Sequence, residues 1–128
     1  MVADIGCGTG VSSLQFLENG NRVIGVEPNA AMRSAALRLN SVHALFTCVD
    51  GTSESIPLPD SSVDLVVAAQ AFHWFEPEAT RAEFRRILKP GGRIALIWNK
   101  RQLDTTPFLV EYEQLLRRYA TDYESVRH

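Results

Sequence analysis

Apolar stretches typical of β-strands alternate with stretches of helical periodicity along most of the chain. Five apolar runs predict strands, at residues 1–5, 22–26, 43–49, 63–69 and 93–98. Four of them are almost continuously apolar, as expected of strands that helices cover on both faces. The alternation therefore predicts βαβ units built around a parallel sheet.

Apolar residues at helical spacing predict connecting helices at 9–18, 29–39 and 77–88. Asn29 is a favourable N-cap for the second helix, and the segment 89–92, Lys-Pro-Gly-Gly, ends the third. After the fifth strand, Thr106 and Pro107 open a further helical stretch. Residues 53–62, rich in proline and hydroxyl side chains, predict a connecting loop rather than a domain boundary.

Composition limits the classes of protein to consider. The 128 residues fit one domain, 1–128, and acidic and basic residues are mixed along the chain with a formal charge of −2. Without a basic stripe, nucleic acid is not an expected partner. No apolar run approaches the roughly 20 residues of a membrane-spanning helix, and the N-terminus lacks a signal-peptide layout. We therefore expect a cytoplasmic protein with no membrane partner.

The two cysteines, Cys7 and Cys48, lie far apart in the sequence. They form no C-x-x-C pair and no histidine cluster accompanies them, so the sequence predicts neither a disulfide framework nor a metal site. Both residues suit a reducing cytoplasm.

The first predicted strand runs directly into a glycine-dense loop, Asp4-Ile5-Gly6-Cys7-Gly8-Thr9-Gly10. Such a loop lets the backbone approach a ligand, and the following helix turns its N–H groups toward that ligand. The spacing is G-x-G-x-G, whereas the dinucleotide fingerprint G-x-G-x-x-G would need glycine where Val11 or Ser13 stands. The loop predicts a nucleotide-type site; the alternative is a tight turn without a ligand.

The second predicted strand ends in Val26-Glu27-Pro28, which places a carboxylate beside the glycine loop. The two oxygens of Glu27 can accept hydrogen bonds from both hydroxyls of a ribose. An acid in this place also suits NAD, and a solvated surface glutamate is the remaining alternative.

Four ordered segments resemble the motifs of class I S-adenosylmethionine (SAM)-dependent methyltransferases. They are residues 2–10, residues 23–27, residues 57–66 and the segment Leu88-Lys89-Pro90-Gly91-Gly92-Arg93. Residues 69–75, Ala-Gln-Ala-Phe-His-Trp-Phe, are similar to the small-molecule branch, methyltransferase type 11, that includes trans-aconitate methyltransferase-like proteins. The resemblance implies a Rossmann-like three-layer α/β/α sandwich with a mainly parallel sheet of about five strands. It also implies SAM as the cofactor and S-adenosylhomocysteine as the product.

The resemblance assigns the cofactor contacts residue by residue. Glu27 would hold the ribose, Pro28 would pack against the adenine, and Gln70, at the end of the fourth strand, joins the cofactor set. The residues that would surround the methionine part are Asp4, Gly6, Cys7, Gly8 and Gly10.

The loop on the adenine side departs from the family pattern. Members commonly read Asp-Ala-Glu ahead of the Leu-Pro element, and the ungapped register places Thr52, Ser53 and Glu54 at these positions. Thr52 thus stands where an acid is usual. Asp50 would replace that acid if the loop is longer by two residues, so Asp50, Thr52 and Ser53 are all candidate contacts.

The implied reaction is an in-line displacement, in which a lone pair on a small-molecule acceptor, a carboxylate among the candidates, attacks the methyl carbon of the sulfonium. Alignment and exclusion of water supply much of the rate, and a base is needed only if the acceptor must lose a proton. His73 lies just past the fourth strand and could act as that base or orient the acceptor, and Trp74 could wall the acceptor pocket. The alternative for both residues is packing in an aromatic turn.

The family's fold usually has a helix before the first strand and two further strands after the fifth helix. This chain resembles the part between them, a partial methyltransferase core that lacks the usual last two strands. The fifth strand would then be an unpaired edge of the sheet. We expect a homodimer formed through that edge or through the last helix, or else poor behaviour in solution.

Two other functions fit part of the pattern. The chain could be a SAM- or nucleotide-binding module without catalysis. An NAD-dependent oxidoreductase is the other alternative, which Asp4, the G-x-G-x-G spacing and the turn at 89–92 disfavour.

Overall fold

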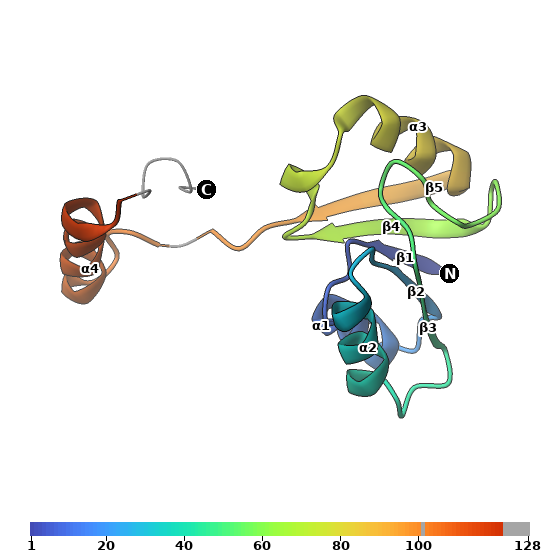
Figure 1. Cartoon of the computed structure of the whole chain (residues 1–128), viewed down its shortest axis with the longest axis horizontal. Helices are drawn as coiled ribbons and strands as arrows, with labels where there is room; N and C mark the ends of the chain where they lie inside the picture. Colours follow the sequence, from blue (N-terminus) through green and yellow to red (C-terminus); the bar gives the residue numbers. More distant parts are fainter. Residues whose placement is uncertain (101, 122–128) are drawn as a thin grey trace. The chain divides into compact units, whose positions relative to one another are not determined.

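The predicted strands all form, and they assemble into one sheet in a computed structural model of the chain (Figure 1). The structure describes residues 1–100 and 102–121. The order of the strands is β3-β2-β1-β4-β5, and every neighbouring pair is parallel. The expected parallel sheet of about five strands is therefore confirmed. The strands are β1 (Val2–Ile5), β2 (Val23–Val26), β3 (Phe46–Val49), β4 (Val63–Ala69) and β5 (Leu88–Ile97).

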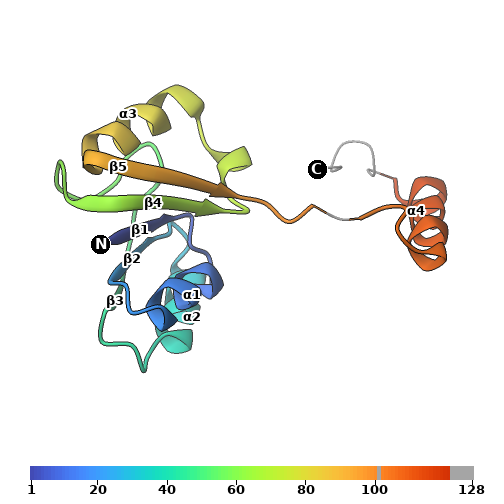
Figure 2. The same cartoon turned by 180° about the vertical axis from the view of Figure 1, so that it is seen from behind.

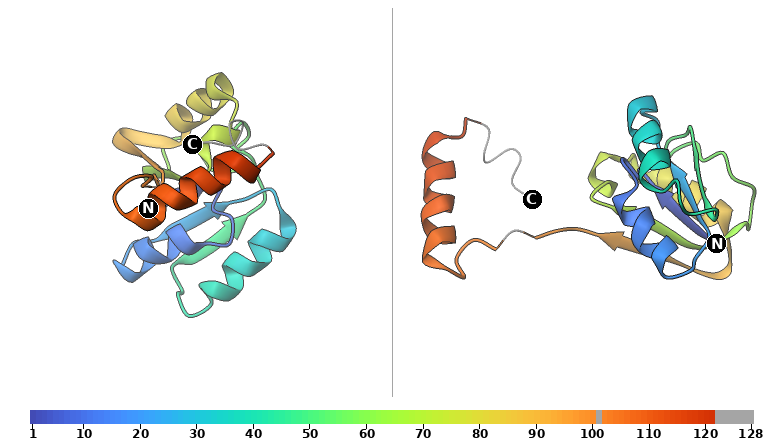
Figure 3. Two further views of the ribbon diagram at one scale, coloured as in Figure 1. Left: turned by 90° about the vertical axis from the view of Figure 1, so that its left-hand side faces the viewer. Right: turned by 90° about the horizontal axis from the view of Figure 1, so that it is seen from below.

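Three α-helices and one 3₁₀ helix connect the strands. They are α1 (Val11–Glu18), α2 (Ala30–Leu39), η1 (Phe72–Trp74) and α3 (Pro77–Ile87). Asn29 caps α2 as predicted, because its side chain accepts a hydrogen bond of 3.1 Å from the backbone N–H of Met32. Helices α1 and α2 lie beside each other, apart from α3 (Figures 2 and 3).

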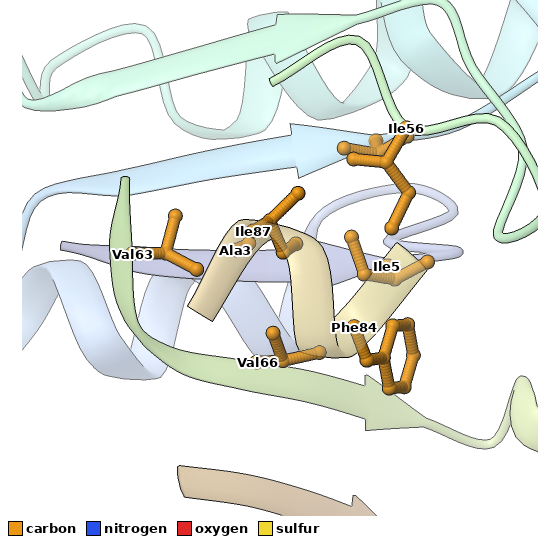
Figure 4. Packing of buried hydrophobic residues seen from close by; sticks show 8 residues of the cluster. Ala3, Ile5, Ile56, Val63, Val66, Phe84 and Ile87 are labelled. Carbon is orange, nitrogen blue, oxygen red and sulfur yellow. The ribbon is translucent and has the colours of Figure 1, made fainter. Parts of the chain in front are cut away.

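Two hydrophobic clusters hold the helices on opposite faces of the sheet, because successive strand side chains point to alternate faces. On one face, Phe84 and Ile87 of α3 point toward β1 and β4 (Figure 4). The other cluster joins α1 and α2 to the sheet through Val2, Leu17, Val23, Ala36, Phe46 and Val67. The expected three-layer α/β/α sandwich is confirmed.

The largest difference from the predicted elements is the start of β5. The sequence predicts a turn at 89–92 and a strand from residue 93, whereas β5 begins at Leu88. Leu88 pairs with Val63 and Arg93 pairs with Leu65, so residues 89–92 form an irregularity within the strand. Gly91 has a φ of +80°, and a Cβ at Gly92 would lie 2.7 Å from the Leu88 side chain. Glycine is therefore needed where the chain folds back closely on itself.

The strand order determines where a ligand can bind. β1 lies at the centre, with β2 and β3 on one side and β4 and β5 on the other. The strands are parallel, so Gly6, Glu27 and Gln70, which follow β1, β2 and β4, meet at the same edge of the sheet. Open α/β sheets bind their ligands at such a point, where the strand order reverses.

The chain divides into two compact units, Met1–Trp98 and Asn99–His128. The described part of the second unit contains α4 (Pro107–Tyr119). The hydroxyl of Thr106 accepts a hydrogen bond of 3.3 Å from the Leu109 N–H, so the predicted helix start is confirmed. No helix among the described residues is both long and apolar enough to span a bilayer. A single domain over 1–128 stays a prediction.

β5 is the edge strand of the first unit. Among the described strands it pairs with β4 alone. Its apolar side chains Ile94, Leu96 and Ile97 are exposed. Exposed strand edges favour pairing with another chain. Self-association through this edge or through the last helix stays a prediction.

Gly10 is a glycine that the fold needs both for its backbone conformation and for its packing. Its φ is +83°, and a Cβ there would lie 2.6 Å from Asn40 Nδ2 and 3.0 Å from the Cβ of Ala36. We expect Gly10→Ala to lower the free energy of unfolding by about 2 kcal/mol, through overpacking added to backbone strain. Urea unfolding measures the loss.

Gly20→Ala is the matched control for Gly10. Gly20 has a similar φ of +86°, but no atom lies within 4 Å of a Cβ added there. The free energy of unfolding of Gly20→Ala should fall only by the cost of the left-handed backbone, about 1 kcal/mol. Equal losses in the two variants would contradict the role of α2 packing.

Candidate cofactor site

The glycine loop joins β1 to α1 through three left-handed residues. The φ angles of Gly6, Gly8 and Gly10 are +70°, +55° and +83°. A Cβ at Gly6 would lie 2.8 Å from the Cβ of Ala71, so the loop packs against the segment that follows β4. No atom lies within 4 Å of a Cβ added at Gly8. Contacts within the protein therefore explain Gly6 and Gly10, while Gly8 borders open space.

Asp4 is a fully buried acid on the central strand. The hydroxyls of Ser12 and Ser13 each donate a hydrogen bond of 2.6 Å to Asp4 Oδ2. Burial raises the pKa of Asp4, and the two hydroxyls oppose that shift. Asp4 Oδ1 is buried and has no hydrogen-bond partner among the described residues. A ligand that donates a hydrogen bond or carries positive charge would satisfy this oxygen.

Sequence reasoning missed the two serines. Their signal is a pair of hydroxyl residues in the first turn of the helix that follows the glycine loop. A turn of helix brings such side chains back toward the preceding strand, because Cβ atoms tilt toward the helix N-terminus.

The raised pKa of Asp4 predicts a pH-dependent stability. The folded protein holds the proton of Asp4 more tightly than the unfolded chain, so stability falls as pH rises from about 3.9 through the folded pKa. We expect the stability of Asp4→Asn relative to the parent to increase as the pH rises above about 4. Urea unfolding at a series of pH values tests it. Asp60→Asn, at an exposed aspartate, is the control, and a parallel increase there would contradict the assignment to Asp4.

Glu27 ties the second strand to the glycine loop. Its Oε2 accepts a hydrogen bond of 3.0 Å from the Gly8 N–H, and its Oε1 accepts one of 2.9 Å from the Asn29 N–H. The side chain is buried, which contradicts the alternative of a solvated surface glutamate. Each carboxylate oxygen can accept a further hydrogen bond, so a ribose could still bind here.

Arg33 organises the neighbouring carbonyls. Its Nη1 donates to the backbone oxygens of Glu27 and Pro28, at 2.8 and 2.7 Å. The same nitrogen lies 3.2 Å from Asp50 Oδ1. Asp50, the residue after β3, thus lies close to the backbone of Pro28. Sequence reasoning did not single out Arg33.

The other residues of the adenine-side loop, Thr52, Ser53 and Glu54, bond within the loop and to Glu76. Ser53 is buried and its hydroxyl donates a hydrogen bond of 2.6 Å to Glu54 Oε1, which also accepts one of 2.9 Å from the Glu76 N–H. These two hydrogen bonds lower the pKa of Glu54 to about 2. Thr52 is exposed and pairs with Ser55 in a short antiparallel bridge. Which of Asp50, Thr52 and Ser53 contacts adenine stays a prediction.

The segment after β4 lies beside the glycine loop. Gln70 has a φ of +55°, and its N–H donates a hydrogen bond of 2.9 Å to the Ile97 carbonyl. Beyond it, η1 carries His73 and Trp74, whose ring centroids are 5.0 Å apart. Trp74 is 80% exposed, so it is not packed into an aromatic turn.

The two phenylalanines of this segment, by contrast, do pack into the aromatic turn. Phe75 packs edge-on against Phe84 of α3 at 6.5 Å between centroids, and Phe72 packs against Trp98 at 6.2 Å. The turn thus has an inner pair of rings, Phe72 and Phe75, and an exposed outer pair, His73 and Trp74.

Comparison with known proteins identifies the family. A family model described as a methyltransferase domain matches residues 3–96. An uncharacterized methyltransferase of Mycobacterium tuberculosis is 41% identical over 100 residues, which cover 78% of this chain and 40% of the relative. An uncharacterized methyltransferase-like protein of Schizosaccharomyces pombe is 35% identical over 126 residues, covering 98% of this chain and 48% of the relative.

Solved structures agree with the fold. A protein of Anaeromyxobacter dehalogenans, described as a candidate type II methyltransferase, superimposes with a TM-score of 0.78 at 36% identity, over 91% of this chain and 50% of that one. The chain thus spans half or less of the length of these proteins. The narrower resemblance to the trans-aconitate branch stays a prediction. With its glycine loop, buried acids and matched residues 3–96, this chain belongs to the methyltransferase domain family.

Proposed function

We propose that this chain binds SAM at the carboxyl edge of β1 and β2 and presents its methyl group to a small-molecule acceptor beside η1. The observation that carries the proposal is the pair of buried acids, Asp4 and Glu27. Neither carboxylate forms a salt bridge with a described residue. Two buried acids at the carboxyl edge of β1 and β2, neither with a cationic partner among the described residues, favour a ligand that brings positive charge.

The preference for a positively charged ligand distinguishes between the two candidate cofactors, SAM and NAD. SAM carries a sulfonium and an ammonium group, and a cation near Asp4 would favour its ionised form against the cost of burial. The pyrophosphate of NAD is negatively charged and would be repelled by Asp4, whereas an acid at the position of Glu27 suits both cofactors. The residues therefore fit SAM better than NAD.

The chain's own residues supply binding and alignment. Asp4 and the backbone of the glycine loop would hold the methionine part, and Glu27 would accept hydrogen bonds from the ribose. Pro28, with Asp50 or with Thr52 and Ser53, would border the adenine. When bound, SAM supplies a methyl group activated by the positively charged sulfur.

We assign the binding place of the methyl acceptor to η1. His73 and Trp74 lie on the segment whose Ala71 contacts Gly6. Their exposed rings would line the acceptor's path and shield the methyl group from water, and His73 would remove a proton where the acceptor carries one. An ionised carboxylic acid is an acceptor that needs no base, so carboxylic acids are the first class to test.

Calorimetric titration and a turnover assay test the proposal together. The chain should bind SAM and S-adenosylhomocysteine and should not bind NAD. Formation of S-adenosylhomocysteine should then depend on an added acceptor from a panel of small carboxylic acids. NAD binding without SAM binding would overturn the cofactor assignment.

A non-catalytic SAM-binding module is the second candidate, because the acids of the proposed cofactor site are buried whereas His73 and Trp74, on the proposed acceptor side, are exposed. Binding of SAM with no methylated product across the panel would support that function over methyl transfer. Product formed by this chain alone would exclude it.

A further inference from the structure

The two cysteines of the chain meet in the fold, although they lie 41 positions apart in the sequence. Cys7 lies in the glycine loop and Cys48 lies in β3, and their sulfur atoms are 3.7 Å apart. β2 runs between the two elements that carry them. The contact therefore links the cofactor loop to a strand two positions away across the sheet.

Gly25 makes this contact possible. It pairs with Asp4 on one side and with Cys48 on the other. A Cβ at position 25 would lie 2.7 Å from Cys7 Sγ and 3.3 Å from Cys48 Sγ. The sulfur atoms thus lie over the space that the missing side chain leaves, and any larger residue would push them apart.

We propose that Cys7 and Cys48 are an oxidation site, at which a peroxide converts the two thiols to a disulfide that weakens cofactor binding by the glycine loop. The formation of the bond rests on the geometry and surroundings of the pair and does not depend on the function proposed above. Its effect on binding rests on the function proposed above.

The environment of the pair assigns different roles to the two sulfurs. The hydrogen bond between the thiols lowers the pKa of Cys48, and the positive charge of Arg33 acts in the same direction. The same hydrogen bond and burial raise the pKa of Cys7. Cys48 is half-buried, whereas Cys7 is buried. Low-pKa, reachable cysteines with a second thiol nearby are the ones that peroxides oxidise.

The chemistry balances with hydrogen peroxide as the oxidant. The Cys48 thiolate attacks one peroxide oxygen, the O–O bond breaks, and hydroxide leaves and takes up a proton to form water. Cys48 is then a sulfenic acid. The Cys7 sulfur attacks the Cys48 sulfur, the S–O bond breaks, and a second water leaves. In total, two thiols and one peroxide give one disulfide and two waters.

A disulfide would shift the cofactor loop. The sulfur atoms must approach from 3.7 Å to about 2.05 Å, which draws Cys7 toward β3. Cys7 lies between two left-handed glycines, Gly6 and Gly8, so the loop backbone moves with it. That movement would disturb the hydrogen bond of 3.0 Å from Gly8 to Glu27. The atoms proposed to contact SAM are thus displaced.

Peptide mapping after peroxide treatment tests the bond itself. Trypsin should release residues 1–22 linked to residues 39–81, and a reducing dithiol should separate them. Free thiols that alkylate fully after treatment with stoichiometric peroxide would overturn the proposal. This readout does not depend on SAM.

Calorimetry on the same samples tests the consequence. The oxidised protein should bind SAM at least about tenfold more weakly than the reduced protein, and the dithiol should restore the affinity. Cys48→Ala leaves Cys7 in the loop, so it should bind SAM like the reduced parent and not respond to peroxide. Equal affinities of the oxidised and reduced parent would overturn the regulatory role. A reduced protein that does not bind SAM would overturn the proposed function instead. Peptide mapping would still show whether the disulfide between Cys7 and Cys48 forms.

Discussion

Replacement of Glu27 by alanine is expected to weaken SAM binding by about 100-fold or more, since each lost hydrogen bond to a charged group contributes about 1.5–3 kcal/mol. The carboxylate has two tasks. It would bind the ribose, and it accepts the N–H groups of Gly8 and Asn29. Both are lost together in the variant. Calorimetry with SAM measures the change, and thermal unfolding verifies that the variant is folded.

Glu83→Ala is the matched control for Glu27. Glu83 also accepts a backbone N–H, that of Ile56 at 2.7 Å, and it pairs with Arg86 at 2.7 Å. It lies on α3 and not at the carboxyl edge of the sheet. The control should lose stability and keep its SAM affinity. If Glu27→Ala bound SAM as tightly as Glu83→Ala, Glu27 would have no role in the cofactor site.

Replacement of Gly8 by alanine is expected to weaken SAM binding by about 30-fold, the equivalent of about 2 kcal/mol of steric conflict. The protein itself leaves room for the added methyl group, because no atom lies within 4 Å of it. A ligand that approaches the loop backbone would collide with it. Titration of the variant with SAM tests the expectation.

Gly20→Ala again serves as the control, because Gly20 shares the left-handed backbone and the open surroundings of Gly8 but lies after α1, away from the loop. The two variants should lose similar stability, and only Gly8→Ala should lose affinity. Unchanged affinity in Gly8→Ala would mean that the cofactor does not approach the backbone at Gly8.

Much of the fold could be predicted from local patterns. The apolar runs and their spacing were sufficient for the five strands, and Asn29 and Thr106 correctly predicted the starts of α2 and α4. The boundaries were less accurate. The third strand begins at Phe46 rather than at residue 43, and β5 begins at Leu88. Pairing with the neighbouring strand decides where a strand begins, and periodicity does not contain that information.

The residues of the candidate site also fall into two groups, those that could be predicted from the sequence and those that could not. The glycine loop and Glu27 could be predicted, because they follow strands at the edge where parallel sheets bind ligands. The hydroxyls that hold Asp4, the arginine beside Asp50 and the link from Glu54 to Glu76 could not be predicted. Each joins elements whose relative position depends on how helices pack on the sheet.

By itself, the sequence determined which segments form strands and helices, where glycine frees the backbone, and which acids follow β1 and β2, because these properties depend on neighbours along the chain. Only the tertiary structure decided that Gly6 packs against Ala71, that Gly8 borders open space and that Cys7 meets Cys48 over Gly25. Those contacts require the order β3-β2-β1-β4-β5 and its register. Strand order and register arise from packing between distant segments, and a pattern along the chain does not contain them.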